Sequence, residues 1–162
     1  MLGNLAHELT TATVLVSATV VIHLIGLDVL MRLTGLHLRR FMSAWHGIDR
    51  LLVPLGIVIG LFTLHGLEIW LYAFAYWTVG LLPSLEAALY YSTSAYSTVG
   101  EAGAMLPKAW RIVGVLEAIN GMLLIGWSTA FLFQVLSHLQ HDEEHPLPKG
   151  AIARRGRRGA KT

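Results

Sequence analysis

Residues 81–100 read LLPSLEAALYYSTSAYSTVG, and this stretch decides how the chain is organised. The Pro-Ser pair at 83–84, followed by Glu86, is typical of a helix start, because it offers a capping hydroxyl ahead of an acidic first turn. The helix can last about ten residues before the Thr-Val-Gly triplet at 98–100, where β-branched residues followed by a glycine favour an extended backbone. The stretch is too apolar for an ordinary loop and too short to cross a membrane, which takes about 20 helical residues.

Apolar runs flank this stretch on both sides. Residues 51–80 before it and 110–139 after it are each long enough to cross about 30 Å of hydrocarbon as a helix. A third run at 9–31 is rich in Ala, Ser and Thr, which suit close helix packing. The sequence therefore predicts an all-α integral membrane protein with three transmembrane helices, plus a re-entrant helix and loop at 81–108 that enter and leave through one face.

The few charged residues indicate the topology. They make up 14% of the chain, against about 25% in a soluble domain. Ten of the twelve Lys and Arg residues lie in two blocks, 32–50 and 149–161. Because basic segments stay on the cytoplasmic side, we expect the N-terminus outside, the C-terminus in the cytoplasm and the re-entrant segment at the outer face. No Lys or Arg precedes the first apolar run, which argues against a cleaved signal peptide.

The sequence lacks the residues or motifs that several kinds of site require. The chain has no cysteine, which excludes a disulfide framework, a thiolate nucleophile, cysteine-ligated zinc and an iron–sulfur cluster. No Walker loop, Gly-x-Ser-x-Gly elbow or His-Glu-x-x-His motif is present. The sequence therefore predicts no catalytic residue, no metal ligand set and no resident cofactor.

Four motifs carry a resemblance to a known family. They are LEAALYYS at 85–92, YSTVG at 96–100, LEAING at 116–121 and IGWSTA at 125–130. In this order they resemble the bacterial potassium-channel-like family with one pore loop per chain, over residues 60–136. The resemblance implies a multi-pass protein of the bacterial inner membrane.

The resemblance also implies a homotetramer whose four loops meet on one axis. The filter would consist of Thr98, Val99, Gly100 and Glu101, and backbone carbonyls would replace the water of potassium or other monovalent cations. Glu101-Ala102 stands where a potassium filter has Tyr-Gly. We therefore expect weakened potassium selectivity and a ring of four Glu101 carboxylates at the outer mouth. The alternative is that Glu101 is a solvated loop acid and selectivity persists in the inner layers.

The predicted third span carries polar and small residues of interest. Glu117 lies at about the depth of the filter, since it is eight residues after Ala109 and therefore about 12 Å below the start of the helix. It is a candidate filter support through Tyr or Ser hydroxyls. Asn120 begins a stripe with Leu124 and Ser128 that faces either a central cavity or a neighbouring helix. Gly121 and Gly126 are candidate gating hinges, although glycines also serve close helix packing.

Three ionisable residues lie inside the first two predicted spans. His65 and Glu68 are three residues apart on one helix face, so they form a candidate membrane-embedded polar pair that braces the pore helix or senses protons. His23 lies at a similar depth to His65, and two facing imidazoles can hold a haem. A haem-binding electron-transfer protein is therefore one rival interpretation. A non-conducting relative of the channel family is the other.

The predicted organisation has three parts. Residues 1–50 form the first transmembrane helix and a basic cytoplasmic linker, 51–140 form the pore module, and 141–162 form a disordered basic cytoplasmic tail. The tail is expected to attract anionic lipid rather than nucleic acid. Within the linker, residues 38–48 show helical spacing of apolar side chains, which fits either an interfacial helix or an extension of the second span.

Overall fold

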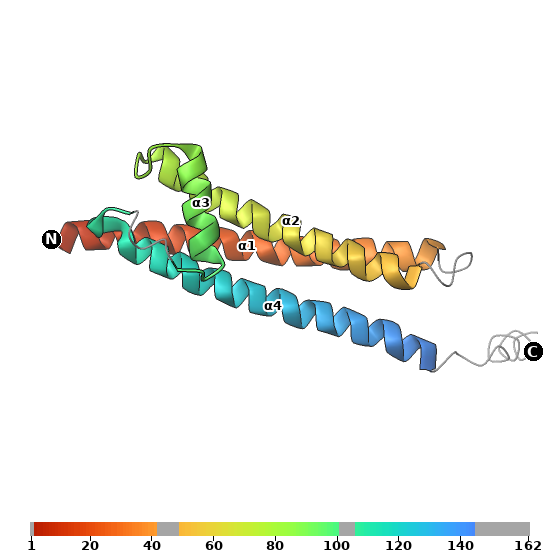
Figure 1. Ribbon diagram of the computed structural model, residues 1–162. Coiled ribbons are helices and arrows are strands. Elements are labelled where there is room, and N and C mark those ends of the chain that lie inside the picture. The colour runs from red at the N-terminus through yellow and green to blue at the C-terminus, as the bar shows by residue number, and fades with distance from the viewer. Residues whose placement is uncertain (1, 42–48, 101–105, 145–162) are drawn as a thin grey trace, which may run out of the picture. The chain divides into compact units, whose positions relative to one another are not determined.

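The computed structural model describes residues 2–41, 49–100 and 106–144, and over these ranges it contains helices and turns and no strand (Figure 1). The prediction of an all-α protein is therefore confirmed. The helices are α1 (Leu2–Phe41), α2 (Asp49–Thr78), α3 (Leu85–Tyr96), the 3₁₀ helix η2 (Lys108–Trp110) and α4 (Arg111–Glu144).

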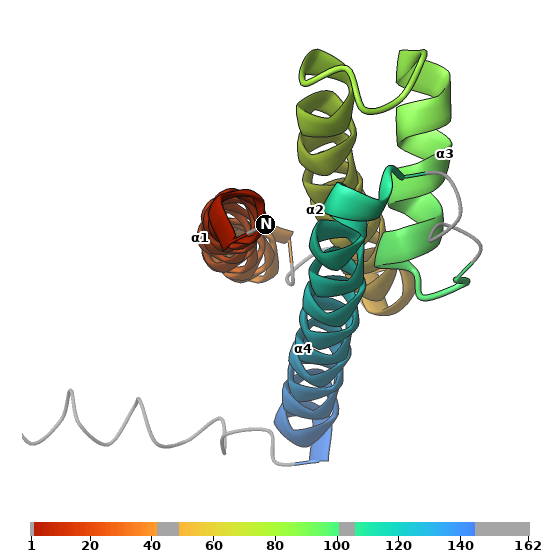
Figure 2. The same cartoon turned by 90° about the vertical axis from the view of Figure 1, so that its left-hand side faces the viewer.

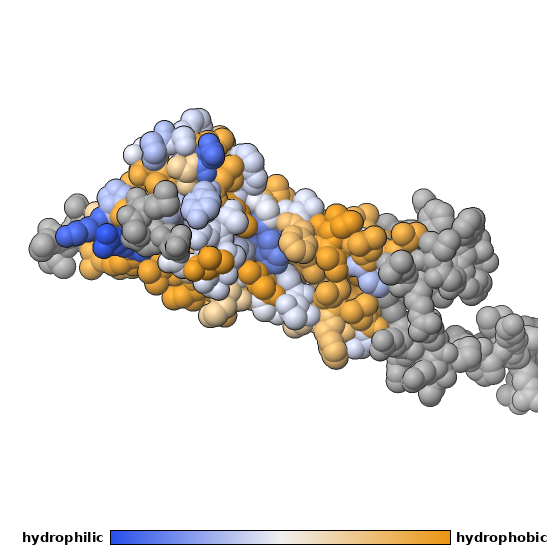
Figure 3. Space-filling model, in the orientation of Figure 1, coloured by the Kyte–Doolittle hydropathy of each residue, from blue (hydrophilic) through white to orange (hydrophobic). Residues whose placement is uncertain are grey.

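Three stretches of helix are long and apolar enough to cross a membrane. They cover Leu5–Gly35, Leu52–Thr78 and Lys108–Ser137, which agrees with the three predicted spans. Large apolar side chains such as Phe62, Val115 and Met122 are exposed on them, and Figure 3 shows apolar side chains spread along the helices on one face. Such exposure is unfavourable in water and suits contact with lipid. The chain is therefore a membrane protein with transmembrane helices.

The turn between α2 and α3 uses the local signals of the sequence. Gly80 takes φ 75°, a left-handed conformation that glycine adopts without strain, and Leu81 N–H donates to the Tyr76 carbonyl at 3.0 Å. Ser84 then caps α3, since its hydroxyl accepts a hydrogen bond from Ala87 N–H at 3.1 Å. The predicted helix start at Pro83-Ser84 is therefore confirmed.

Helix α3 is the shortest of the described α-helices and packs alongside α2 (Figure 2). The rings of Tyr76 and Tyr91 meet edge to face with centroids 5.3 Å apart. Ala73, Ala88 and Val113 are fully buried in the same core. Small side chains here allow α3 to lie close to its neighbours. The helix therefore packs against the part of α2 that is apolar enough to span a membrane.

By its internal contacts the chain divides into two compact units, Met1–Leu132 and Phe133–Thr162. The second unit contains the last part of α4, and residues 145–162 of the expected tail lie outside the described residues. Of the expected interfacial segment 38–48, residues 38–41 belong to α1, and the rest lies outside the described residues. All contacts described below lie within the first unit.

Candidate functional site

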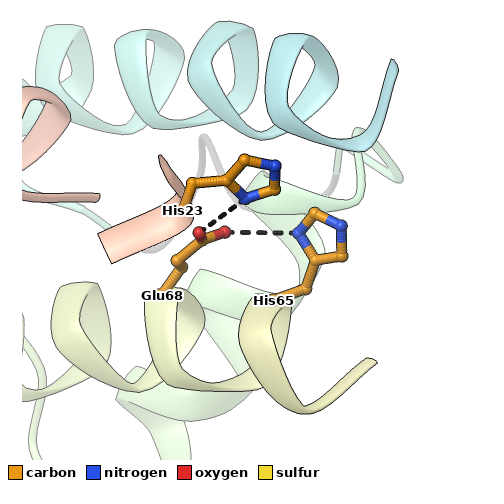
Figure 4. Close-up of side chains that lie close together, drawn as sticks. All are labelled: His23, His65 and Glu68. Atoms are coloured by element: carbon orange, nitrogen blue, oxygen red, sulfur yellow. Dashed lines mark hydrogen bonds and ion pairs between the residues drawn. The ribbon is translucent and has the colours of Figure 1, made fainter. Parts of the chain in front are cut away.

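A buried carboxylate joins two histidines between α1 and α2 (Figure 4). Glu68 and His23 are both 0% exposed. His23 Nδ1 lies 2.9 Å from Glu68 Oε1, and His65 Nδ1 lies 3.2 Å from Glu68 Oε2. Each carboxylate oxygen thus faces one imidazole, and the structure brings His65 and Glu68 together as the sequence analysis expected of one helix face.

Helices α3 and α4 each add one hydroxyl to this group. The Tyr96 hydroxyl donates to Glu68 Oε2 and lies 2.9 Å from His65 Nδ1. Ser128 Oγ lies 2.9 Å from His65 Nε2 and 3.3 Å from His23 Nε2. We refer to His23, His65, Glu68, Tyr96 and Ser128 as the Glu68 cluster. Burial, together with the hydrogen bond to Glu68, raises the pKa of Tyr96, so this phenol keeps its proton.

A second buried acid, Glu117 of α4, binds the middle of α3. Ser92 Oγ donates to Glu117 Oε1 at 2.5 Å, and Tyr76 Oη donates to Glu117 Oε2 at 2.7 Å. Ser92 Oγ is also 2.9 Å from the Ile69 carbonyl of α2. Burial and the nearby Glu117 carboxylate raise the pKa of Tyr91 to about 12. We refer to Glu117, Tyr76 and Ser92 as the Glu117 cluster, and it links α2, α3 and α4 through hydroxyl groups.

Asn120 packs against neighbouring helices within the described part of the chain, which is the second of the two alternatives that its spacing left open. The side chain is 4% exposed, and its Nδ2 donates to Thr19 Oγ1 at 2.8 Å and to Tyr72 Oη at 3.4 Å. Leu124 and Ser128 on the same stripe are also buried. The polar residues of the stripe bond to α1 and α2 because an amide or hydroxyl among apolar helices needs a hydrogen-bond partner.

The two glycines proposed as hinges differ in their surroundings. A Cβ built at Gly121 would overlap the Tyr96 carbonyl oxygen, whereas a Cβ at Gly126 would meet no atom within 4 Å. Gly121 therefore allows α4 to approach the end of α3 closely. Gly126 has no such packing contact in the part of the chain that the structure describes, and its role as a hinge stays a prediction.

The segment after α3 turns outward and is strained. Val99 N–H donates to the Ser94 carbonyl at 3.1 Å, and Val99 is 74% exposed. Thr98 takes φ 61° and Gly100 takes φ 91°. A β-branched residue at positive φ costs about 1–3 kcal/mol, and strain of this kind clusters at functional sites. Glu101 of the predicted filter lies outside the described residues.

An open groove of about 300 Å³ lies between this segment and α4. Its lining includes Tyr91, Thr98 and Gly100 on one side and Gly114, Ala118 and Met122 on the other. Among the described residues, the groove leaves Thr98 and Gly100 open on one side.

The geometry does not fit a haem between His23 and His65. A haem would need one nitrogen of each imidazole to face the iron from opposite sides of the porphyrin. Instead both Nδ1 atoms face the same carboxylate, both Nε2 atoms face Ser128, and the ring centroids are 5.3 Å apart. Protein side chains thus occupy the space that a porphyrin would need, and we do not propose electron transfer.

Comparison with family models, with curated proteins and with solved structures finds no match for this chain. The function is therefore argued from the arrangement of its own residues. The sequence identified most of the members of the two clusters separately. It did not pair His23 with Glu68 or Tyr96 with Glu68, because these residues are 45 and 28 positions apart.

Proposed function

We propose that four copies of the chain form a cation channel in which α3 is the pore helix and Thr98, Val99, Gly100 and Glu101 line the filter. Permeant potassium or other monovalent cations would be held by backbone carbonyls of the four loops. The order of the helices supports the resemblance to the bacterial potassium-channel-like family. The long helix α2 and the short helix α3 precede the Thr-Val-Gly segment, and the long helix α4 follows it.

The observation that carries the proposal is the exposed, strained segment at the C-terminal end of α3. Irregular backbone beside membrane-spanning helices is tolerated only where protein covers it or water reaches it. Val99 is 74% exposed in the single chain, so the cover would come from other copies or from a water-filled path. The C-terminal end of a helix also carries partial negative charge, which favours a cation at this position.

The two buried clusters support the same assignment. A filter needs carbonyl oxygens held at fixed spacing, and α3 is tied to its neighbours both in its middle and at its end. Ser92 bonds to Glu117 of α4, and Tyr96 bonds to Glu68 of α2. Tyr96 precedes Thr98 by two residues, so the anchored turn leads directly into the filter segment.

The open groove beside Thr98 is a candidate contact between copies. Its α4 side carries the exposed residues Val115, Ile119 and Met122. An α3 end and an α4 face from adjacent chains would together close the groove, which is the arrangement expected if four loops meet on one axis.

The topology and the selectivity belong to the same proposal. Basic residues at 32–50 and 149–161 favour a cytoplasmic C-terminus and an external filter mouth in a bacterial inner membrane. The Glu101 ring would concentrate cations there, and the Tyr-Gly pair missing after Gly100 favours weak discrimination between potassium and sodium.

The decisive experiment is ion flux in liposomes that contain the purified tetramer, with its assembly checked by native mass spectrometry. We expect flux of both potassium and sodium. Glu101→Gln should change the conductance, whereas Glu86→Gln, an exposed acid in the first turn of α3, serves as the matched control. A correctly assembled tetramer without flux would contradict the channel proposal and favour a non-conducting relative. Strong exclusion of sodium would overturn only the weak selectivity.

The absence of cysteine makes the topology easy to test. Single-cysteine variants Asn4→Cys and Ala160→Cys can be treated in intact cells with a maleimide that does not cross membranes. Labelling of Asn4→Cys alone is expected, and labelling of Ala160→Cys alone would reverse the orientation.

A further inference from the structure

We propose that His23, His65 and Glu68 bind a divalent transition-metal ion, with Zn²⁺ as the best match. Each side chain offers one ligand atom, and these atoms all lie within 4.8 Å of one another. Figure 4 shows the carboxylate between the two imidazoles, which approach it from α1 and from one turn earlier on α2. The site does not depend on whether the chain conducts ions.

The distances between the ligand atoms suit a metal of this size. Zinc binds imidazole nitrogen at about 2.0–2.1 Å and carboxylate oxygen at about 2.0–2.2 Å, so ligand atoms around a tetrahedral ion are about 3.3 Å apart. His23 Nδ1 lies 2.9 Å from Glu68 Oε1, and His65 Nδ1 lies 3.2 Å from Glu68 Oε2, so each imidazole faces its own carboxylate oxygen. One ligand atom from each of the three side chains lies within 4.8 Å of the other two, so movements of at most about 1.5 Å would bring all three onto one ion. The Tyr96 hydroxyl oxygen lies 2.9 Å from His65 Nδ1.

Ser128 lies where an outer partner of both histidines would be needed. Its Oγ faces the Nε2 atoms of both rings, at 2.9 Å from His65 and 3.3 Å from His23. A hydroxyl has one hydrogen and two lone pairs, so it can serve both Nε2 positions, either as donor to one and acceptor from the other or as acceptor from both.

With a metal at both Nδ1 atoms, all four ring nitrogens have partners. Both Nε2–H groups would donate to Ser128 Oγ, whose two lone pairs accept both. Tyr96 would donate to the second oxygen of Glu68, which orients that ligand. Outer hydrogen bonds of this kind are the usual support of histidine and carboxylate ligands.

Charge balance points in the same direction. Glu68 is fully buried, and among the described residues its ion-pair partners are His23 and His65. An ionised carboxylate inside a span needs a compensating positive charge. A divalent ion supplies it while both imidazoles stay neutral. Two imidazoles and one carboxylate favour zinc or a neighbouring transition metal over Mg²⁺ or Ca²⁺, which prefer oxygen ligands.

A metal here would fix more than the two histidines. It would cross-link α1 to α2, and through Tyr96 it would hold the last turn of α3, two residues before Thr98. Loss of the metal should therefore loosen α1 and the end of α3 together.

The test measures zinc bound to the full chain in detergent, with any affinity tag removed. His138, His141 and His145 could also bind metal, so the background variant replaces all three by alanine. We expect one tightly bound Zn²⁺ per chain, and X-ray absorption should show nitrogen and oxygen ligands at about 2.0–2.2 Å. His23→Ala, His65→Ala and Glu68→Gln should each lose it. Ser128→Ala should weaken zinc affinity by about 10- to 100-fold, since it removes only an outer hydrogen bond.

The control is His7→Ala. The His7 ring meets Trp110 edge to face, away from the cluster, so its loss should leave zinc binding unchanged. A second measurement does not depend on variants that fail to fold: Co²⁺ added to the background protein should give the strong visible bands of a four-coordinate ion. Sub-stoichiometric zinc together with six-coordinate cobalt would overturn the proposal and leave a metal-free histidine–glutamate pair. Zinc that survives all three ligand substitutions would overturn it as well.

Discussion

Replacing Glu117 by leucine tests whether the Glu117 cluster holds α3 in place. The substitution removes the acceptor of two hydroxyl hydrogen bonds, from Ser92 at 2.5 Å and from Tyr76 at 2.7 Å. The two donors are not affected equally. Ser92 retains the Ile69 carbonyl, 2.9 Å away, as an acceptor, whereas the buried Tyr76 Oη has no second acceptor among the described residues.

The expected cost follows from that difference. One buried hydroxyl without a partner costs about 1–3 kcal/mol, and the Ser92 bond is largely replaced. Glu117→Leu should therefore lower the free energy of unfolding by about 1–3 kcal/mol. Tyr76→Phe in the same chain removes the stranded hydroxyl, so the double variant should recover part of the loss. The coupling energy between the two positions should be about 0.5–2 kcal/mol, the range of hydrogen bonds between membrane helices.

The assay is a double-mutant cycle on the free energy of unfolding in mixed micelles, followed by circular dichroism as the denaturing detergent increases. Four proteins suffice: the unchanged chain, the two single variants and the double variant. Additive effects of the two substitutions, or a Glu117→Leu variant as stable as the unchanged chain, would refute the view that this carboxylate is the acceptor that anchors Tyr76 and α3.

Three further predictions follow from the contacts of α3. Gly121→Ala should lower the free energy of unfolding by about 1–3 kcal/mol, because the added Cβ would overlap the Tyr96 carbonyl. Gly126→Ala is the comparison in the same unfolding assay: its Cβ would enter open space, so the variant should be neutral or stabilised by up to about 1 kcal/mol. Ser84→Ala should cost about 1 kcal/mol through loss of the α3 cap, and Ser84→Asp should retain most of that stability. Thr98→Gly should relieve the backbone strain at φ 61°, so the melting temperature should stay the same or rise, while ion flux in liposomes should fall. A lower melting temperature would contradict the strain argument.

Features that depend on neighbouring residues in sequence were predictable. The three spans follow from uninterrupted apolar runs, and the start of α3 follows from Pro83-Ser84 ahead of Glu86. The end of the first helix was not predictable in the same way. Composition marks where the apolar part ends, near residue 31, but α1 continues to Phe41 because a helix does not have to stop at the end of its apolar stretch.

Contacts between distant residues were only partly predictable. His65 and Glu68 are three positions apart, so one helix face brings them together. Nothing local relates His23 to Ser128, which are 105 positions apart. Asn120 illustrates a different limit of sequence patterns. A spacing of three or four residues identifies a helix face but does not say which neighbour that face contacts. In the structure the Asn120 face packs against α1 and α2.

The position of α3 depends on polar contacts because its surroundings are apolar. Between membrane-spanning helices the hydrophobic effect hardly distinguishes one apolar neighbour from another, so hydrogen bonds and close packing decide which surfaces meet. Helix α3 has one such anchor on each side: Ser92 bonds to Glu117 of α4, and Tyr96 bonds to Glu68 of α2. Loss of either acid would remove one of these two side-chain anchors and leave the other, together with the apolar packing of the helix. With both in place, the strained turn at Thr98 has a fixed base, which a filter built from backbone carbonyls requires.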